Sequence, residues 1–448
     1  MVKDFGKWLL PLLLAASGAC LADPAMAQGR GGPPAGLPAG LPPATPGGLP
    51  GGFPGGPPDM PSRGPPPWAA DAAGNRVDGI ARADAVRSQA MAEPERRRAT
   101  ARYKADPAAY ELDRNGALAI RGEVLATGLD GADLAKIERK GFSILRRDEI
   151  AGLGTTLAVL ERGGTPAAKA LHILRRIAPQ GTYALNHVMF ESGAGAGSAP
   201  PRARQPAAGG RAVRVGMIDT GVAPAVGSSA RVRLVSRNFA QGAGSAEQHG
   251  TAVAELLARA PGDVTIYAAD IFGPDPHDGT SELLIRALGW MAGQRVPVVN
   301  ISMVGPPNPI VGAVTGKLIG LGFTIVAPVG NDGPAARPLY PASYPGVVAV
   351  SAAGADGRLL PEASRVRRVD FVAPGIATVA GISGRGAEVR GTSFAAPLVS
   401  RLLADRLDDP DPEAARRAIA ELAREAQRPR KDRRWFGHGL VAESADAR

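Results

Sequence analysis

Three short motifs between residues 215 and 397 supply a carboxylate, an imidazole and a hydroxyl. Asp219 stands directly after the apolar run Val213–Ile218 and is followed by Thr-Gly. His249 begins a helical pattern in His-Gly-Thr-Ala-Val-Ala, and Ser393 follows Gly-Thr at the start of another helical pattern. A serine hydroxyl is a poor nucleophile without a neighbouring base such as histidine, which needs a buried carboxylate to fix its tautomer. Together the three residue types predict nucleophilic attack on an acyl group.

Each motif alone also has an ordinary structural interpretation. An aspartate after a strand is commonly a turn or cap residue, and a serine at a helix start is commonly an N-cap. A single histidine at a helix start is more often structural than catalytic. The combination carries the prediction, because all three residues fall where strands end or helices begin, and open α/β sheets form their ligand crevice there.

The chain order Asp, His, Ser is the order found in subtilisin. With the motifs Asp-Thr-Gly, His-Gly-Thr and Gly-Thr-Ser-Phe-Ala-Ala-Pro, residues 211–445 resemble the subtilisin-like serine proteases, the subtilase or peptidase S8 family, in the bacterial form with an N-terminal propeptide. The resemblance implies that Asp219, His249 and Ser393 form a catalytic triad. It also implies hydrolysis of peptide bonds through an acyl-enzyme, with proteins or peptides as substrates.

A further segment, Ala327–Gly333, resembles the Ala-Ala-Gly-Asn-x-Gly turn of this family. The resemblance implies that the side chain of Asn331 and the backbone N–H of Ser393 bind the oxyanion that forms during acyl transfer. Outside this context, Asn331 would be interpreted as a turn residue in the left-handed conformation. The family also implies a substrate-binding set, which comprises Ser302, Met303, Val304, Gly305, Val329 and Gly330.

Val304 departs from the family pattern, because the family usually has glycine at this position on the wall of the P1 pocket. The P1 residue is the substrate residue before the cleaved bond. A β-branched side chain here should narrow the pocket, so we expect a preference for small or unbranched P1 side chains.

The expected fold class is α/β, with a subtilisin-like three-layer arrangement around a largely parallel sheet. Short apolar runs recur through residues 211–445 with helical patterns between several of them, which is typical of such a sheet. The predicted strands are Val213–Ile218, Val264–Ala269, Val296–Ile301, Thr324–Pro328, Val347–Ser351 and Val369–Val372.

A small ferredoxin-like α+β domain is predicted before the catalytic domain, over residues 108–190. Its pattern reads β-α-β-β-α-β, with a last strand over Tyr183–Phe190. The segment Leu185–Phe190 resembles the end of bacterial subtilase propeptides, so we expect an intramolecular inhibitor; a small domain unrelated to inhibition would show the same periodicity. Residues 191–210 have linker composition, and we expect maturation to cut within 191–212.

The N-terminal region predicts export. Residues 1–27 combine Lys3 and Lys7, an apolar core and an Ala-Met-Ala cleavage site, which is typical of a signal peptide. The alternatives are a buried helix or membrane anchor, or lipid attachment through Cys20, which lacks the usual aliphatic residue before it. Residues 28–107 are Pro/Gly-rich and then Ala/Arg-rich, and we expect disorder there, with loose helix as the alternative over residues 68–107. The predicted location is the periplasm or the outside of the cell.

Composition narrows the remaining function classes. No apolar run after the first 30 residues can span a bilayer, so a polytopic membrane protein is excluded and no stable membrane insertion is expected. One cysteine and five histidines make thiolate or histidine-rich metal sites improbable, and we expect no cofactor. Calcium dependence is common in the family, but no acidic cluster here has regular ligand spacing.

Two other functions stay open from the sequence. A weakly catalytic subtilase fold could act as a scaffold, although the presence of all three triad residues and Asn331 argues against this. The net charge of +10 could suggest a nucleic-acid-binding protein. No segment interleaves arginine with aromatic residues, so we expect no nucleic-acid partner.

Overall fold

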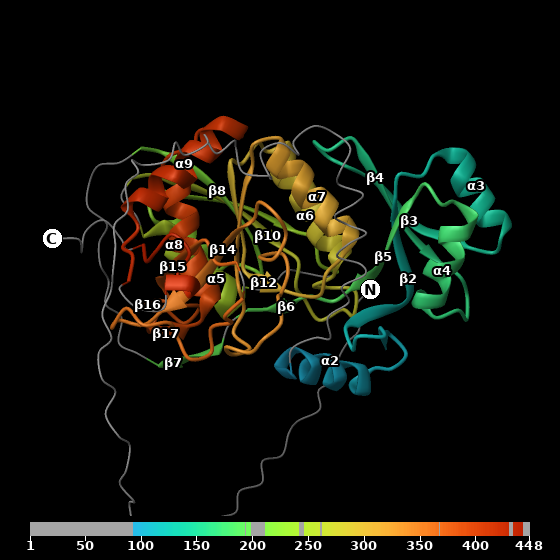
Figure 1. The fold of residues 1–448 in the computed structure, drawn as a ribbon, viewed down its shortest axis with the longest axis horizontal. Helices are drawn as coiled ribbons and strands as arrows, with labels where there is room; N and C mark the ends of the chain where they lie inside the picture. The colour runs from blue at the N-terminus through green and yellow to red at the C-terminus, as the bar shows by residue number, and fades with distance from the viewer. Residues whose placement is uncertain are drawn as a thin grey trace, which may run out of the picture. The chain divides into compact units, whose positions relative to one another are not determined.

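The computed structural model describes residues 93–192, 194–198, 211–241, 246–259, 262–366, 368–429 and 433–441. The predicted signal peptide, Cys20 and the Pro/Gly-rich segment as far as residue 92 lie outside the described residues. We call residues 108–192 the small unit and residues 211–441 the large unit (Figure 1).

The large unit contains a seven-stranded sheet in which every neighbouring pair is parallel. Its order is β15-β14-β13-β11-β8-β10-β9. The strands are β8 (Val213–Asp219), β9 (Val232–Asn238), β10 (Val264–Asp270), β11 (Val298–Ile301), β13 (Thr324–Pro328), β14 (Val348–Ala353) and β15 (Phe371–Pro374). This sheet confirms the predicted α/β class. The sequence analysis missed β9, because it is an edge strand in which arginines interrupt the apolar run.

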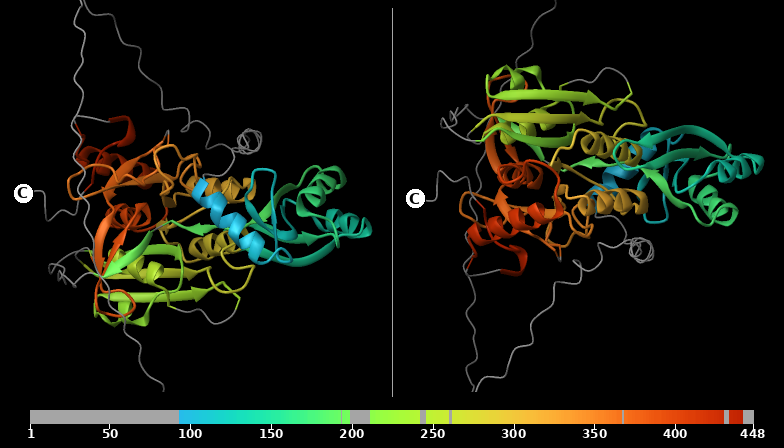
Figure 2. Two further views of the ribbon diagram at one scale, coloured as in Figure 1. Left: turned by 90° about the horizontal axis from the view of Figure 1, so that it is seen from below. Right: turned by 90° about the horizontal axis from the view of Figure 1, so that it is seen from above.

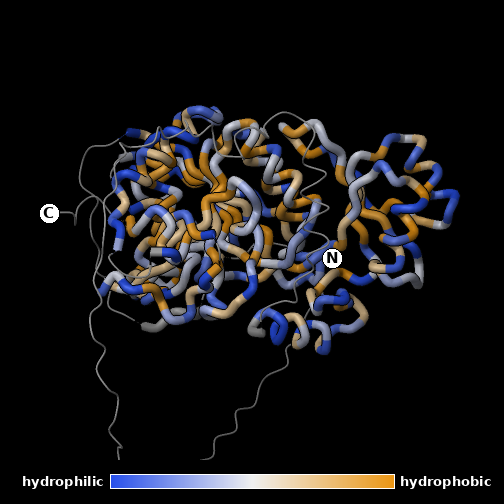
Figure 3. The backbone as a smooth tube through the Cα atoms, viewed as in Figure 1, coloured by the Kyte–Doolittle hydropathy of each residue, from blue (hydrophilic) through white to orange (hydrophobic). Residues whose placement is uncertain are grey.

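Helices cover both faces of the sheet, so the large unit has three layers (Figures 1 and 2). One apolar cluster joins the sheet to α5 (Gln248–Ala258), α8 (Thr392–Ala404) and α9 (Pro412–Glu425). Another cluster joins it to α6 (Ser281–Gly293) and α7 (Pro309–Gly320). Figure 3 shows the apolar backbone segments concentrated between these layers. Strands buried on both faces are continuously apolar, which is why their positions could be predicted. Two short 3-10 helices, η1 (Pro224–Ser228) and η2 (Arg433–Trp435), complete the helices described.

The small unit has the predicted β-α-β-β-α-β order. Its four main strands pair antiparallel in the order β5-β2-β4-β3, and two helices cover one face. The elements are β2 (Leu118–Thr127), α3 (Gly131–Arg139), β3 (Ser143–Ile150), β4 (Thr155–Glu161), α4 (Ala167–Ile177) and β5 (Thr182–His187). Asp130 begins α3 with a capping box, since its side chain and that of Asp133 each accept the other residue's backbone N–H.

Two predicted boundaries need correction. Part of the segment predicted to be disordered, residues 28–107, forms helix α2 (Glu93–Ala105), which is followed by β1 (Tyr110–Leu112). The sequence of α2 is highly charged and has almost no apolar face, so periodicity could not reveal it. The helix is held by tertiary contact, because Ala99 is fully buried against an apolar cluster that includes Phe190.

The predicted linker 191–210 is also partly regular structure. Residues Phe190–Glu191 form β6, which pairs antiparallel with β12 (Met303–Val304). Ala194–Ser198 form β7, which pairs antiparallel with β17 (Ala387–Arg390), the partner of β16 (Ile376–Val379). Of the predicted linker, the described residues 191–192 and 194–198 thus contact the large unit. Among the described helices, none is both long and apolar enough to cross a membrane.

Candidate active site

The fold brings the three predicted catalytic side chains together. Asp219 is the last residue of β8, and His249 and Ser393 are each the second residue of their helices, α5 and α8. His249 Nδ1 lies 2.7 Å from Asp219 Oδ1, and His249 Nε2 lies 3.1 Å from Ser393 Oγ. The carboxylate, imidazole and hydroxyl thus form one hydrogen-bonded chain, in the geometry that nucleophilic catalysis by serine requires.

The start of α5 is fixed to the end of β8 by two threonines, Thr220 next to Asp219 and Thr251 two residues after His249. The Thr220 hydroxyl accepts the backbone N–H of Gly250 at 2.8 Å, and the Thr251 hydroxyl accepts that of Ala223 at 3.0 Å. A Cβ at Gly250 would lie 2.2 Å from the Thr220 carbonyl oxygen. Only glycine allows this approach, so the Gly after His249 sets the distance between imidazole and carboxylate.

The start of α8 is tied to β11 through a chain of buried polar side chains. Asn300 Nδ2 donates to Ser302 Oγ at 2.6 Å, and Ser400 Oγ donates to Asn300 Oδ1 at 3.0 Å. Ser302 Oγ donates in turn to the carbonyl of Ser393 at 3.4 Å. The main chain of Ser393 is therefore held in place by Ser302, which directly follows β11, as well as by the first turn of α8.

Asn331 lies beside the nucleophile, in the turn after β13. Its Oδ1 accepts the backbone N–H of Thr392 at 2.9 Å, so the amide plane is fixed and Nδ2 is left as a donor. Gly391 has φ +138°, and a Cβ there would lie 3.1 Å from Asn331 Nδ2. Gly391 thus lets Asn331 approach the first turn of α8, where helix N–H groups and an amide donor can meet a developing negative charge.

Carboxylates dominate the electrostatics of His249. Burial lowers the pKa of its imidazole, but the charge and hydrogen bond of Asp219 outweigh burial, and Glu191 and Glu247 add to the effect. The net result is a pKa of His249 above its usual value. A raised pKa makes the neutral imidazole a stronger base, although that neutral form is reached only at a higher pH.

The chain's own strand β6 lies along the predicted substrate-binding segment. Glu191 pairs with Met303, and Phe190 pairs with Val304. Ser192 donates its backbone N–H to the carbonyl of Ser302 at 3.3 Å.

The remaining predicted substrate-binding residues differ in their contacts. Gly305 faces Met189, because a Cβ at Gly305 would lie 2.5 Å from Met189 Sδ. Val329 and Gly330 are buried just before Asn331, and their main chains bond to Val350 and Ser364 instead of to β6.

Helix α2 contributes a residue that the sequence analysis did not single out. Arg98 donates from Nη1 to the carbonyl of Glu191 at 3.2 Å, and its guanidinium lies 5.1 Å from the centre of the Phe190 ring. Arg98 Nη2 also lies 3.9 Å from Asp332 Oδ1, next to Asn331. Residues 98 and 191 are far apart in the sequence, so no local pattern signals this contact.

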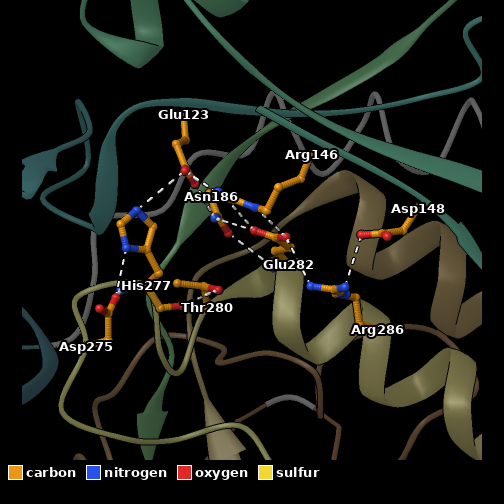
Figure 4. Close-up of polar contacts among 9 residues, drawn as sticks. All are labelled: Glu123, Arg146, Asp148, Asn186, Asp275, His277, Thr280, Glu282 and Arg286. Atoms are coloured by element: carbon orange, nitrogen blue, oxygen red, sulfur yellow. Dashed lines mark hydrogen bonds and ion pairs between the residues drawn. The ribbon is translucent and has the colours of Figure 1, made fainter. Parts of the chain in front are cut away.

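A second contact between the units consists of charged side chains (Figure 4). Arg146 of β3 donates to both carboxylate oxygens of Glu282 on α6, at 2.9 and 2.8 Å, and to Glu123 Oε1 at 2.8 Å. Asn186 Oδ1 accepts the backbone N–H of Glu282 at 3.1 Å, in the first turn of α6. Asn186 Nδ2 donates to Glu123 Oε2 at 2.7 Å. We call Glu123, Arg146, Asn186 and Glu282 the charge cluster.

No metal site is evident in the part of the chain that the structure describes. No group of three or more histidine, cysteine, aspartate or glutamate side chains there could hold an ion. The expectation that no cofactor is needed remains a prediction.

Serine proteases are among the known proteins that this chain resembles. The minor extracellular protease Epr of Bacillus subtilis is 27% identical over 258 residues, 53% of this chain and 39% of that protein. The major intracellular serine protease of B. subtilis is 25% identical over 44% of this chain and 68% of that protein. This chain thus spans about two fifths of the length of Epr.

Two solved structures share the fold. Fervidolysin from Fervidobacterium pennivorans has a TM-score of 0.60 and 17% identity, over 74% of this chain and 61% of that chain. The epidermin leader peptide processing protease of Staphylococcus aureus has a TM-score of 0.54 and 15% identity, over 72% and 96%. The model described as Subtilase family (Peptidase_S8) matches residues 210–439, which is just over half of the chain. With that match, and with these relatives, the chain belongs to the subtilase family.

Proposed function

We propose that this protein is an exported serine endopeptidase that is made as an autoinhibited zymogen. The observation that carries the proposal is the hydrogen-bonded chain from Asp219 through His249 to Ser393. Asn331 stands beside that chain, where it can donate to an oxyanion. Protein or peptide substrates follow from the family of the chain.

In the proposed reaction, Ser393 Oγ attacks the carbonyl carbon of the substrate and gives its proton to His249 Nε2. Asp219 accepts the Nδ1–H of His249, which keeps Nε2 free to take that proton and stabilises the imidazolium. Asn331 Nδ2 and the backbone N–H of Ser393 stabilise the oxyanion. His249 then returns the proton to the leaving amine, and water releases the acyl group by the same steps in reverse.

The position of β6 supports autoinhibition. A main-chain strand already pairs with β12, and the small unit from which it emerges is anchored to α6 through the charge cluster. A peptide substrate would need the same edge of β12, so β6 competes with it directly. The small unit is therefore proposed to be the propeptide.

The proposed export rests on the N-terminal sequence and on the extracellular relative. Residues 1–27 have the pattern of a signal peptide, and Epr is named an extracellular protease. Periplasm and extracellular space are both compatible with this pattern.

Intact-mass spectrometry of residues 28–448 tests the proposal, beside the Ser393→Ala variant. We expect the wild type to separate into two fragments and to hydrolyse casein, and the variant to stay whole and inactive. A wild type that stays whole and leaves casein intact would support a scaffold function and overturn the proposal.

A further inference from the structure

We infer that the site first cuts its own chain at the peptide bond on the carboxyl side of Ser192. The cleft then binds the four residues before the bond, which are Met189, Phe190, Glu191 and Ser192. This inference rests on the proposed function and deepens it, since it assigns one bond and one substrate class to the same site.

Strand pairing before the bond sets the register. Ser192 bonds to Ser302, Glu191 pairs with Met303, and Phe190 pairs with Val304. Side chains in a strand alternate between two faces, so a slip of one residue would turn every side chain of this segment to the wrong side. The register therefore places Ser192, and no neighbour, at the end of the segment that pairs with β12.

Strand pairing after the bond gives the same position independently. In β7, Ala194 pairs with Arg390 of β17, and β17 leads through Gly391 and Thr392 into Ser393. The chain is thus paired to the large unit on both sides of the nucleophile. Ser192 is the last described residue before that crossing point.

Side-chain contacts of Ser192 agree with this placement. Asn331 Nδ2 donates to Ser192 Oγ at 3.3 Å, and Ser192 Oγ lies 3.4 Å from Thr392 Oγ1. The preceding residue, Glu191, is close enough to His249 to affect its pKa. The small side chain of Ser192 thus contacts Asn331, the proposed oxyanion donor, and Glu191 lies near His249, the proposed general base.

The chemical step is an ordinary acyl transfer. Ser393 Oγ forms a bond to the Ser192 carbonyl carbon, and its proton passes to His249. The bond from that carbon to the next nitrogen breaks, and the new amine takes the proton from His249. Water then hydrolyses the ester, which leaves one fragment with a carboxylate at Ser192 and another that begins at residue 193. In other substrates, we expect a small polar residue directly before the bond and apolar residues at the third and fourth positions before the bond.

Intact mass and N-terminal sequencing of the processed protein test the assignment. We expect the large fragment to begin at residue 193. Ser192→Pro should slow the cut at this bond by about tenfold or more, because proline lacks the N–H that Ser302 accepts. Ser192→Ala is the matched control, since it keeps this N–H and a small side chain, and it should be cut at the same bond.

The outcomes separate this inference from the proposed function. A large fragment that begins at another residue overturns the assignment while the Ser393 chemistry stands, and so does unchanged cutting of Ser192→Pro at this bond. A wild type that hydrolyses casein but stays whole overturns the assignment and the zymogen part of the proposed function, while the Ser393 chemistry stands. A wild type that neither processes itself nor hydrolyses casein overturns both.

A second inference is carried by α2 and does not depend on where the chain is cut. We propose that α2 locks β6 in the cleft through Arg98. One guanidinium contacts the Glu191 carbonyl, the Phe190 ring and Asp332, so it joins β6 to the loop that carries Asn331. Ala99, the next residue, is fully buried in the cluster that holds Phe190 from the side of the small unit.

Hydrogen exchange of the uncut Ser393→Ala chain tests this lock. We expect Arg98→Ala to raise the exchange rate of amides in residues 188–192 about three- to tenfold, since it removes a charged hydrogen bond and a cation–π contact. Arg97→Ala, an exposed residue of the same helix, is the matched control and should leave exchange unchanged.

Two further measurements complete the test of the lock. Circular dichroism should show that the Arg98→Ala variant keeps its helical content. In the chain with Ser393 intact, Arg98→Ala should also make the processed enzyme active sooner. Equal exchange in the Arg98 and Arg97 variants would overturn the lock, whatever the catalytic activity of the protein.

Discussion

Two of the contacts between the small unit and the large unit differ in kind, and they lie beside an apolar contact that joins the small unit to α6 and α7. At the cleft, main-chain groups make the contact, as β6 pairs with β12 and the Ser192 N–H reaches the Ser302 carbonyl. At α6, the charge cluster makes it, through specific side chains (Figure 4). Any extended peptide can use the first contact, whereas only this small unit can use the second. Inhibition is therefore built from one contact that imitates a substrate and another that no substrate shares.

The charge cluster is strong only as a complete set. Burial lowers the pKa of Arg146, but hydrogen bonds and charges from Glu282 and Glu123 raise it above its usual value, so the guanidinium stays charged. The guanidinium of Arg146 faces two carboxylates, and the Asn186 amide and the start of α6 donate to them as well. Arg286 lies 3.7 Å from Glu282, and His277 Nε2 lies 3.5 Å from Glu123. Buried groups of this kind stabilise an interface little when complete, but the loss of one member leaves a buried charge unpaired.

The largest effect is expected in the cleft, where substrate and β6 share the site. Asn331→Ala should lower kcat by about 10²–10³, the loss measured when the corresponding donor is removed from subtilisin, and should change KM little. The measurement is steady-state hydrolysis of a peptide by the processed enzyme. The variant should also keep the charge cluster intact, so exchange of the α6 amides is the control. An unchanged kcat would contradict the oxyanion role of Asn331.

At the side-chain contact, Arg146→Ala should speed release of the cut small unit by about tenfold to a hundredfold, because it removes the one guanidinium that bonds to both Glu123 and Glu282 and leaves Glu282 only the longer contact with Arg286. The measurement is the delay before the processed protein becomes active. Asp148→Ala is the matched control at the same interface, because Asp148 pairs only with Arg286 among the described residues, whereas Arg286 itself also lies 3.7 Å from Glu282 of the charge cluster. Arg286 pairs with Asp148 in an exposed position at 3.2 Å, and such pairs contribute about 0–1 kcal/mol. Equal delays in the two variants would refute the role of the charge cluster.

A smaller effect concerns the pH dependence of the first cut. Burial lowers the pKa of His249, while Asp219 and then Glu191 and Glu247 raise it to a net value above normal. Glu191→Gln removes one of these charges, so the pKa of His249 should fall and the acid limb of the self-cleavage rate should move to lower pH. Hydrolysis of an added peptide after β6 has left is the control, because its pH profile should not change. A self-cleavage profile that does not move would contradict the prediction.

The sequence could predict the parts whose causes are local. Strands buried on both faces are apolar throughout, so the positions of six of the seven parallel strands could be predicted from short apolar runs in the sequence. The triad followed from short motifs such as the Gly after His249, which the close approach of the Thr220 carbonyl requires. The Thr220 hydroxyl that holds α5 could have been found in the same motif.

The remaining parts depend on contacts between distant residues. Arg98 and Glu191 are brought together by the fold, as are Arg146 and Glu282. No local sequence pattern distinguishes these four arginines and glutamates from ordinary surface residues. The register of β6 is likewise fixed by its partner strand and not by its own composition, which is why residues 191–210 resembled a linker.

The smallest expected effect concerns the α2 lock and a buried carboxylate within it. Burial, with Asp332 nearby, raises the pKa of Glu95 from 4.5 to about 8, while Arg98 acts in the opposite direction. Neither oxygen of Glu95 has a hydrogen-bond partner among the described residues. The docked helix therefore takes up a proton, and its docking should be strongest below pH 4.5 and weaken as the pH rises towards 8.

Glu95→Gln removes this titration without changing the size of the side chain. In the uncut Ser393→Ala chain, we expect the α2 amides of the parent to lose protection between pH 4.5 and about pH 8, after correction for intrinsic exchange. The Glu95→Gln variant should keep its protection over the same range. Asp332→Asn should fall between the two, because it removes the neighbouring charge but leaves Glu95 buried. A parallel loss of protection in all three proteins would show that another group controls the docking of α2, and would separate the lock from its pH response.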